Sequence, residues 1–206
     1  MSSRFGLPLV LDGSQVTALV VGGGAVASRK IAALLDGGVS ARVRALRVSD
    51  ELSRRAAVDE HLVIESSAYD AAAIGDAMLV VAATDDNEVN ARVAADARAL
   101  RRFVIVADDA AAGNCVMPAV HRSGELVVAV ASGGVPRASA RVRDALAQRL
   151  DDRYAAAIHE LGRLRQRLLA HDDRASWRSA VQELLSDDFC ESVESGAFSE
   201  RLAAWQ

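Results

Sequence analysis

The sequence is poor in cysteine and aromatic residues, and it has no excess of positive charge. Two cysteines far apart in the chain, Cys115 and Cys190, form neither a disulfide framework nor a zinc-binding pair. We expect Cys115, in an apolar run, to be a core residue rather than a nucleophile. The four histidines show no metal-ligand spacing, and 28 acidic against 24 basic residues argue against a nucleic-acid partner.

Long apolar runs are absent as well. No segment approaches the roughly 20 apolar residues that a membrane-spanning helix needs. The first ten residues lack the basic start and long apolar middle of a secretion signal. We therefore expect a cytoplasmic protein that does not bind to a membrane.

The most informative stretch that is present runs from Thr17 to Lys30, the only lysine. An apolar strand-like segment leads into Gly22, Gly23 and Gly24 and then into a segment typical of a helix. The order strand, glycine turn, helix is typical of the first βα unit of a dinucleotide-binding fold, and Gly22, Gly24 and Ala27 fit its G-x-G-x-x-G/A spacing. A tight turn without a ligand is the alternative.

Strand and helix patterns alternate up to Gly113, which predicts a Rossmann-like, doubly wound parallel sheet over residues 1–113. We expect an edge strand at Leu7–Leu11 and a turn after it. The main expected strands are Thr17–Val21, Ser40–Leu46, Leu62–Ile64, Met78–Ala83 and Phe103–Val106, and the helices are Ala25–Leu35, a short one capped by Ser49, a turn at Ala71–Ala77 and Glu88–Leu100.

The pattern changes after Gly113. Two apolar runs, Cys115–Val120 and Leu126–Ala131, flank five residues that we expect to close a β-hairpin. Helical sequence then runs from Pro136 to the C-terminus with breaks near Asp151, at 171–174 and at 186–188. We divide this part into a segment that contains the hairpin, 114–150, and a helical C-terminal domain, 151–206, which is too small to bury its own core well and should pack on the sheet domain or on a second subunit.

Ligands of open α/β sheets bind at the carboxyl ends of the strands. Thr84 lies there and could either contact a ribose or phosphate or cap the next helix. Asp108 and Asp109 follow another strand, where either could be a general base or both could be solvated loop carboxylates. At the end of the second strand, Arg44 and Arg47 stand where a carboxylate would hold the ribose of NAD; an arginine there could accept the extra phosphate of NADP or only line the surface.

Five ordered motifs resemble the precorrin-2 dehydrogenase / sirohydrochlorin ferrochelatase family, the N-terminal module of siroheme synthases. They are VVGGGAVASRK (20–30), AATDDNEVN (82–90), VIVADDA (104–110), VMPA (116–119) and VAVASGG (128–134). The resemblance implies oxidation of precorrin-2 to sirohydrochlorin with NAD⁺ as acceptor, and Fe²⁺ insertion to give siroheme as a second step. NADP is not excluded, and a homodimer joined through the hairpin and the following helices is implied.

The resemblance also implies roles for individual residues. Asp108 would be the catalytic base. The nucleotide would be bound by the turn, Gly22, Gly23, Gly24, Ala25 and Val26, and by Thr84 and Asp85. Ser132 would lie at the entrance to the tetrapyrrole cleft, and the arginines just beyond it, Arg137, Arg141 and Arg143, suit a substrate with eight carboxylates, although a solvated helix face is the alternative.

The sequence departs in two places from the pattern that the family often shows. Ile105 replaces an asparagine three residues before the aspartate, and Val135, Pro136 and Arg137 replace a Ser-Pro pair after the S-G-G turn. Two further hypotheses stay open. The protein could be a dehydrogenase without chelatase activity, or a nucleotide-sensing module without chemistry.

Overall fold

The structure is a computed structural model that describes residues 6–205. The chain divides into two compact units, Met1–Met117 and Pro118–Gln206. Residues 1–5 and 206, the outer ends of the predicted segments 1–113 and 151–206, lie outside the described residues. The division into three segments stays a prediction.

The first unit is built on a five-stranded parallel sheet, which confirms the predicted sheet, and the structure adds its strand order, β3-β2-β1-β4-β5. The strands are β1 (Thr17–Val21), β2 (Ser40–Arg44), β3 (Leu62–Glu65), β4 (Leu79–Ala82) and β5 (Phe103–Val106). The order reverses between β1 and β4. Val21 pairs with both Arg44 and Ala82, so the loops after β1, β2 and β4 begin at the same edge of the sheet.

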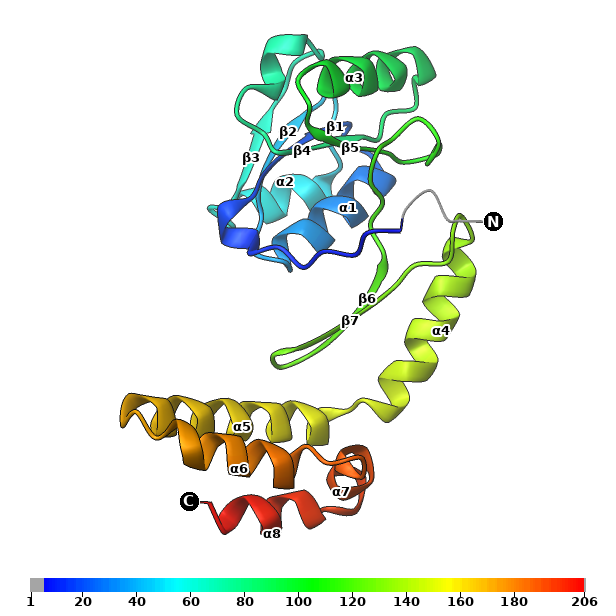
Figure 1. Cartoon of the computed structure of the whole chain (residues 1–206). Coiled ribbons are helices and arrows are strands. Elements are labelled where there is room, and N and C mark those ends of the chain that lie inside the picture. The colour runs from blue at the N-terminus through cyan, green and yellow to red at the C-terminus, as the bar shows by residue number, and fades with distance from the viewer. Residues whose placement is uncertain (1–5, 206) are drawn as a thin grey trace. The chain divides into compact units, whose positions relative to one another are not determined.

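Helices cover both faces of this sheet (Figure 1). On one face α1 (Ala25–Leu35) and α2 (Asp50–Ala56) pack against apolar strand residues. On the other face lie α3 (Asn87–Ala99) and a short 3₁₀ helix, η2 (Ala71–Ile74). The strand β4, and β1 after Thr17, are apolar because both of their faces are covered.

The predicted edge strand at Leu7–Leu11 is wrong. This segment has no regular structure, and a 3₁₀ turn, η1 (Gly13–Gln15), follows it. Its apolar side chains are exposed, with Leu7 at 80% and Val10 at 83%. Among the described residues, this segment pairs with neither outer strand of the sheet, β3 or β5, although each leaves one edge open. Pro8 also lacks the N–H that a ladder needs.

The second unit begins with the predicted hairpin, but the turn differs. The strands are β6 (Ala119–Ser123) and β7 (Leu126–Val130), with Ser123 opposite Leu126. The connection is therefore Gly124 and Glu125 rather than five residues, and Cys115 lies before the strand. Gly124 has a φ of +54°, the conformation that a two-residue hairpin turn requires at its first position.

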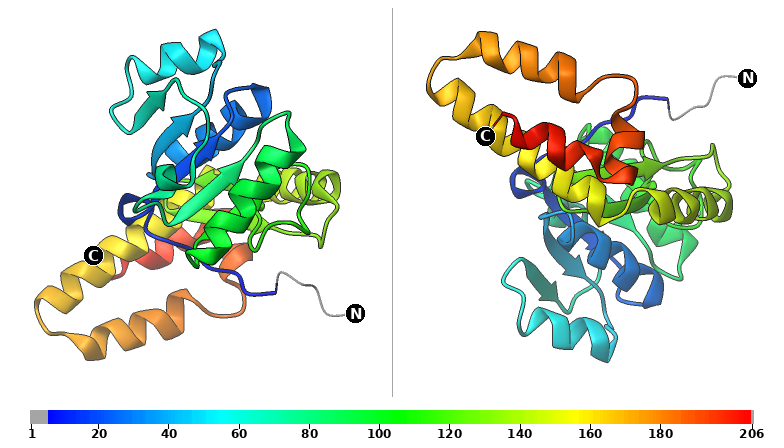
Figure 2. Two further views of the ribbon diagram at one scale, coloured as in Figure 1. Left: turned by 90° about the horizontal axis from the view of Figure 1, so that it is seen from above. Right: turned by 90° about the horizontal axis from the view of Figure 1, so that it is seen from below.

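Five helices follow the hairpin, α4 (Pro136–Arg149), α5 (Asp152–Ala170), α6 (Arg174–Leu184), α7 (Phe189–Ser195) and α8 (Ala197–Ala203) (Figure 2). The breaks agree with the prediction, except that the one at Gly196, with a φ of +88°, was not expected. The expectation that the tail buries little core is wrong, because α5 to α8 enclose a buried apolar cluster that includes Tyr154, Leu184 and Phe198.

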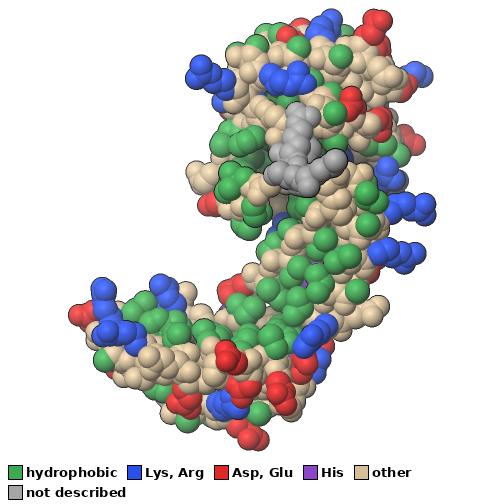
Figure 3. Space-filling model, turned by 45° about the vertical axis from the view of Figure 1, so that its right-hand side comes forward, with side chains coloured by type: hydrophobic (Ala, Val, Ile, Leu, Met, Phe, Trp, Pro, Cys, Tyr) green, Lys and Arg blue, Asp and Glu red, His purple; other side chains and the backbone are tan. Residues whose placement is uncertain are grey.

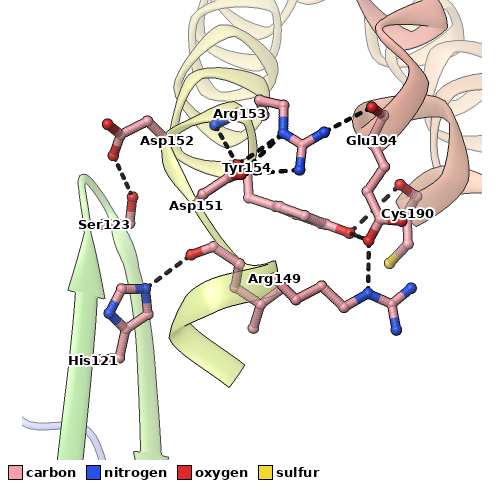
Figure 4. Close-up of polar contacts among 10 residues, drawn as sticks. His121, Ser123, Arg149, Asp151, Asp152, Arg153, Tyr154, Cys190 and Glu194 are labelled. Atoms are coloured by element: carbon pink, nitrogen blue, oxygen red, sulfur yellow. Dashed lines mark hydrogen bonds and ion pairs between the residues drawn. The ribbon is translucent and has the colours of Figure 1, made fainter. Parts of the chain in front are cut away.

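Polar contacts join the hairpin and the helices of the second unit (Figure 4). The His121 ring nitrogen Nε2 lies 2.8 Å from the carbonyl oxygen of Leu150, in the junction between α4 and α5. The phenol of Tyr154 donates to Glu194 Oε1 at 2.8 Å, and Arg149 Nε donates to the same oxygen at 2.6 Å. The buried start of α5 is thus tied to α4 and to α7.

Within residues 6–205, no helix is both long enough and apolar enough to cross a membrane.

Candidate functional site

The turn after β1 contains three glycines, and the space for a side chain differs among them. Gly22 has a φ of +121°, and a Cβ there would lie 2.2 Å from the carbonyl oxygen of Ala83. A Cβ on Gly23 would lie 2.3 Å from the carbonyl oxygen of Arg47. Gly24 differs, since its φ is −83° and nothing lies within 4 Å of a Cβ built on it. The chain's own packing therefore requires Gly22 and Gly23 but not Gly24, which borders open space.

The open space lies at the N-terminus of α1. Gly24 is the N-cap residue and offers no side chain to the free N–H groups of the first turn, which holds no acidic residue. By contrast, Ser49 caps α2 and Asp86 caps α3. Of the first two residues of α1, Ala25 is exposed and Val26 is partly buried. An uncapped helix N-terminus beside a glycine without a packing role is suited to a phosphate group.

The turn after β4 is held by its own hydrogen bonds. Thr84 Oγ1 lies 2.8 Å from Asn90 Oδ1 and 2.9 Å from the carbonyl oxygen of Asp86. Asn90 is 3% exposed, and its amide nitrogen donates to the Thr84 carbonyl at 3.1 Å. These contacts favour a structural role for the threonine hydroxyl. Asp86 caps α3, whereas Asp85 is exposed and has no hydrogen bond or ion pair among the described residues.

Sequence reasoning missed Asn90. The sequence does show an asparagine near the start of a helix that follows a T-D-D turn. Its contact with Thr84 could not be predicted, because the contact depends on the folded shape of that turn.

The two aspartates after β5 have different surroundings. Asp109 Oδ1 accepts hydrogen bonds from the backbone N–H groups of Ala111 at 2.8 Å and Ala112 at 3.2 Å, so it stabilises the turn. Asp108 is exposed and has no hydrogen bond or ion pair within residues 6–205. Of the two carboxylates, Asp108 is thus the one free to contact a ligand.

The two arginines at the end of β2 also differ. Arg44 lies 3.0 Å from Asp70 and 3.8 Å from Glu65, and its Nε donates to Ser67 Oγ at 2.8 Å. These contacts hold Arg44 within the sheet unit. Arg47 is exposed, and the described part of the chain gives it no ion pair or hydrogen bond.

The candidate substrate residues belong to the second unit. Ser132 Oγ donates to the carbonyl oxygen of Val135 at 2.6 Å and lies 2.6 Å from the hydroxyl oxygen of Ser139, which is buried. Ser132 therefore shapes the turn that begins α4. Arg137 and Arg141 are four residues apart on α4, so they share one face of the helix. Both are exposed and without a polar partner in the described residues.

Arg143 is occupied, because it forms an ion pair with Asp144 at 2.6 Å and donates to the carbonyl oxygen of Val120 at 3.3 Å. The arginines that follow Ser132 are thus of two kinds, one paired and two free.

The thiol of Cys115 is partly buried against the sheet core. Burial raises its pKa to about 11, so the group is a neutral thiol near pH 7 and a poor nucleophile. Among residues 6–205, no group of three or more His, Cys, Asp or Glu side chains is placed to hold a metal ion.

Known proteins are similar to this chain in sequence and in fold. Residues 9–119 match a family described as putative NAD(P)-binding. The siroheme synthase of Saccharophagus degradans is 36% identical over 162 residues, which cover 78% of this chain and 35% of that protein. The siroheme synthase of Pseudomonas putida is 37% identical over 207 residues, which cover 97% of this chain and 41% of that protein.

The chain thus spans less than half the length of these siroheme synthases. A solved structure titled "SirC, precorrin-2 dehydrogenase" shares the fold with a TM-score of 0.73, at 24% identity, over 97% of this chain and all of that one. The family match covers more than half of the chain and includes the glycine turn described above, in which Gly24 borders open space. The chain belongs to the putative NAD(P)-binding family, and nearly its whole length is similar to siroheme synthases, whose N-terminal module its motifs resemble.

Proposed function

We propose that the protein oxidises precorrin-2 to sirohydrochlorin, with a nicotinamide dinucleotide as hydride acceptor, in siroheme biosynthesis. The observation that supports a dinucleotide cofactor is the uncapped start of α1, where Gly24 borders open space that no part of the described chain fills. The backbone N–H groups of Ala25 and Val26 would hold the pyrophosphate there. We propose precorrin-2 as the substrate from the names of the similar proteins.

The chemistry assigned to the chain's own residues is proton transfer. The nicotinamide ring, when bound, takes the hydride, and a proton must also leave the macrocycle. Asp108 would accept that proton, because of the two aspartates after β5 it is the one that does not hold the turn. Asp85 and Thr84 would border the nucleotide from the neighbouring loop, with the Thr84 hydroxyl acting mainly through the turn that it stabilises.

The substrate is strongly anionic, and cationic side chains must offset its carboxylates. Arg137 and Arg141 would do so, since both guanidinium groups are exposed and unpaired on one face of α4. Ser132 would contribute by fixing the start of α4 rather than through a free hydroxyl. Insertion of Fe²⁺ needs a base for the pyrrole protons as well, which Asp108 would supply. The altered turn at Val135, after Ser132, makes this second activity one to test separately.

A homodimer fits the surface of the second unit. Apolar side chains lie at the surface of the molecule (Figure 3), and those of the second unit include Val127, Val135 and Val142, at 36%, 56% and 50% exposure. A self-complementary interface would bury such side chains. Light scattering coupled to size-exclusion chromatography tests this state directly. The cytoplasmic location expected from the sequence stays a prediction.

The decisive experiment is anaerobic incubation of the full chain with precorrin-2 and NAD⁺ or NADP⁺, followed by Fe²⁺, with absorption spectra after each addition. Sirohydrochlorin and reduced dinucleotide should form together. Iron-dependent conversion faster than without protein would add the chelatase step, and its absence would leave a dehydrogenase. No oxidation with either dinucleotide would refute the enzyme function and favour a sensing module.

Asp108→Asn tests the catalytic assignment, with Asp109→Asn as its matched control. Loss of a general base should slow turnover about 100-fold or more while the dinucleotide Kd stays unchanged. Asp109→Asn removes the same charge one residue away but keeps an oxygen for the two backbone N–H groups. Equal losses in both variants would contradict the assignment of Asp108.

A further inference from the structure

The loop that follows β5 leaves the sheet at Ala107 and returns to it at Asn114, so Asp108 lies between two contacts with the strands. We propose that Asn114 is a positioning residue for Asp108, because its side chain fastens the returning end of this loop to β5. The inference rests on the proposed role of Asp108 as the base and adds the contact that holds its loop in place.

Asn114 bonds to the outer edge of β5 in the way that a neighbouring strand would. Its backbone N–H donates to the carbonyl oxygen of Val104 at 2.9 Å. Its side-chain oxygen Oδ1 accepts from the Val104 N–H at 2.7 Å, and its Nδ2 donates to the carbonyl oxygen of Arg102 at 2.9 Å. A single residue thus satisfies three backbone groups on an edge with which no strand of the described chain pairs.

Gly113 allows the loop to approach β5 this closely. A Cβ on Gly113 would lie 2.7 Å from the Val104 carbonyl oxygen and 3.4 Å from the Val106 nitrogen. The loop therefore returns against β5 without space for a side chain at this position. This close approach brings the amide of the next residue, Asn114, within reach of Val104.

Hydrogen bonds also hold the rest of the loop. The Ala107 N–H donates to a carbonyl oxygen of β4 at 2.9 Å. Asp109 accepts from two backbone N–H groups of the turn, and Arg98 of α3 donates to the carbonyl oxygen of Ala112. Asp108 differs, because its side chain has no polar partner within residues 6–205.

The place of the Asp108 carboxylate is therefore set by the backbone of the loop, and that backbone is fastened at its returning end by Asn114. A displacement of a reacting group by about 1 Å can lower turnover by as much as about 100-fold. Loss of the Asn114 amide should thus act on turnover through Asp108 and not on the binding of the dinucleotide.

The test is a double-mutant cycle in kcat for precorrin-2 oxidation, with Asn114→Ala, Asp108→Asn and the variant that carries both changes. We expect Asn114→Ala to lower kcat about tenfold and to leave the KM and the dinucleotide Kd within about twofold. In the Asp108→Asn background the same change should lower kcat less than about twofold, because no base is left to position. Equal factors in the two backgrounds would indicate a merely structural role and overturn the inference.

Two further measurements separate positioning from a folding defect. Asn114→Asp keeps an oxygen for the Val104 N–H and loses the donation to Arg102, so it should retain more of kcat than Asn114→Ala. Hydrogen exchange of the amides in the turn after Asp109 should be faster in Asn114→Ala, whereas exchange in β1 should not change. Unchanged exchange in that turn would contradict the inference.

Asp59→Ala is the matched control, because Asp59 Oδ1 accepts from the His61 N–H at 3.1 Å, beside the amino end of the other outer strand, β3. It removes a comparable side-chain contact with the backbone and should leave kcat unchanged. Wild-type turnover in Asn114→Ala, together with lost turnover in Asp108→Asn, would overturn the inference alone. If the wild type does not oxidise precorrin-2, or if Asp108→Asn keeps full turnover, the proposed function or its base fails and the inference fails with it.

Discussion

Replacing single glycines of the turn after β1 separates the needs of the fold from those of a ligand. Gly22→Ala places a methyl group 2.2 Å from the Ala83 carbonyl oxygen at a φ of +121°. The left-handed conformation costs about 1 to 2 kcal/mol and overpacking typically about 1 to 3 kcal/mol more. We expect this variant to lose about 3 kcal/mol of unfolding free energy.

Gly24→Ala should behave in the opposite way. Its φ of −83° suits any residue, and no atom lies within 4 Å of the new methyl group. Alanine is a poorer N-cap than glycine by about 1 kcal/mol, but it restricts the unfolded chain by about 0.4 to 1 kcal/mol. These effects nearly cancel, so stability should change by less than about 0.5 kcal/mol. The methyl group would meet a bound pyrophosphate, and dinucleotide affinity should fall about tenfold or more.

The assay must follow the unfolding of the first unit, which contains the parallel sheet. Both tryptophans, Trp177 and Trp205, lie in the second unit, so tryptophan fluorescence would not follow the sheet. Hydrogen exchange of the β1 and β4 amides, with far-UV circular dichroism in urea, measures stability, and calorimetry measures dinucleotide binding. Wild-type affinity in a folded Gly24→Ala variant would refute the assignment of this open space to a phosphate. Wild-type stability of Gly22→Ala would refute the packing argument.

Three further predictions follow from the described contacts. Asn90→Ala should cost about 2 kcal/mol in urea unfolding, because it leaves polar groups of the buried Thr84 turn without partners. The hydrogen bond from Arg149 holds the pKa of Glu194 below its ordinary value of 4.5. The ionised carboxylate should therefore stabilise the helical tail above that pH, and this stabilisation should be lost as the pH falls toward the lower folded pKa. In Glu194→Gln, the unfolding free energy monitored by tryptophan fluorescence should depend less on pH. Arg137→Ala combined with Arg141→Ala should raise the KM for the tetrapyrrole about tenfold and leave the dinucleotide Kd unchanged, and an unchanged KM would contradict their role.

Local sequence determined the elements in which one short stretch carries the whole signal. The bounds of β1 and α1 agree with the prediction residue by residue, because an apolar run, three glycines and a helix-compatible segment specify a strand, a turn and a helix without distant partners. The parallel sheet follows from the same alternation of strands and helices, whereas its strand order is seen only in the structure. The motifs likewise pointed to the family before any contact was known.

Pairing and neighbours decided the rest. The apolar run at Leu7–Leu11 resembles a strand but pairs with neither open edge of the sheet, and the hairpin register depends on Gly124 rather than on where the apolar residues end. Apart from the family resemblance, the residues could not distinguish Asp108 from Asp109, or Arg44 from Arg47, because each pair consists of like side chains close together at the end of one strand. Only the tertiary structure shows that Asp109 and Arg44 are occupied, because the groups that hold them come from a backbone turn and from neighbouring segments. The sequence by itself thus specified the sheet and the glycine turn, whereas the availability of each charged side chain was decided by what folding placed beside it.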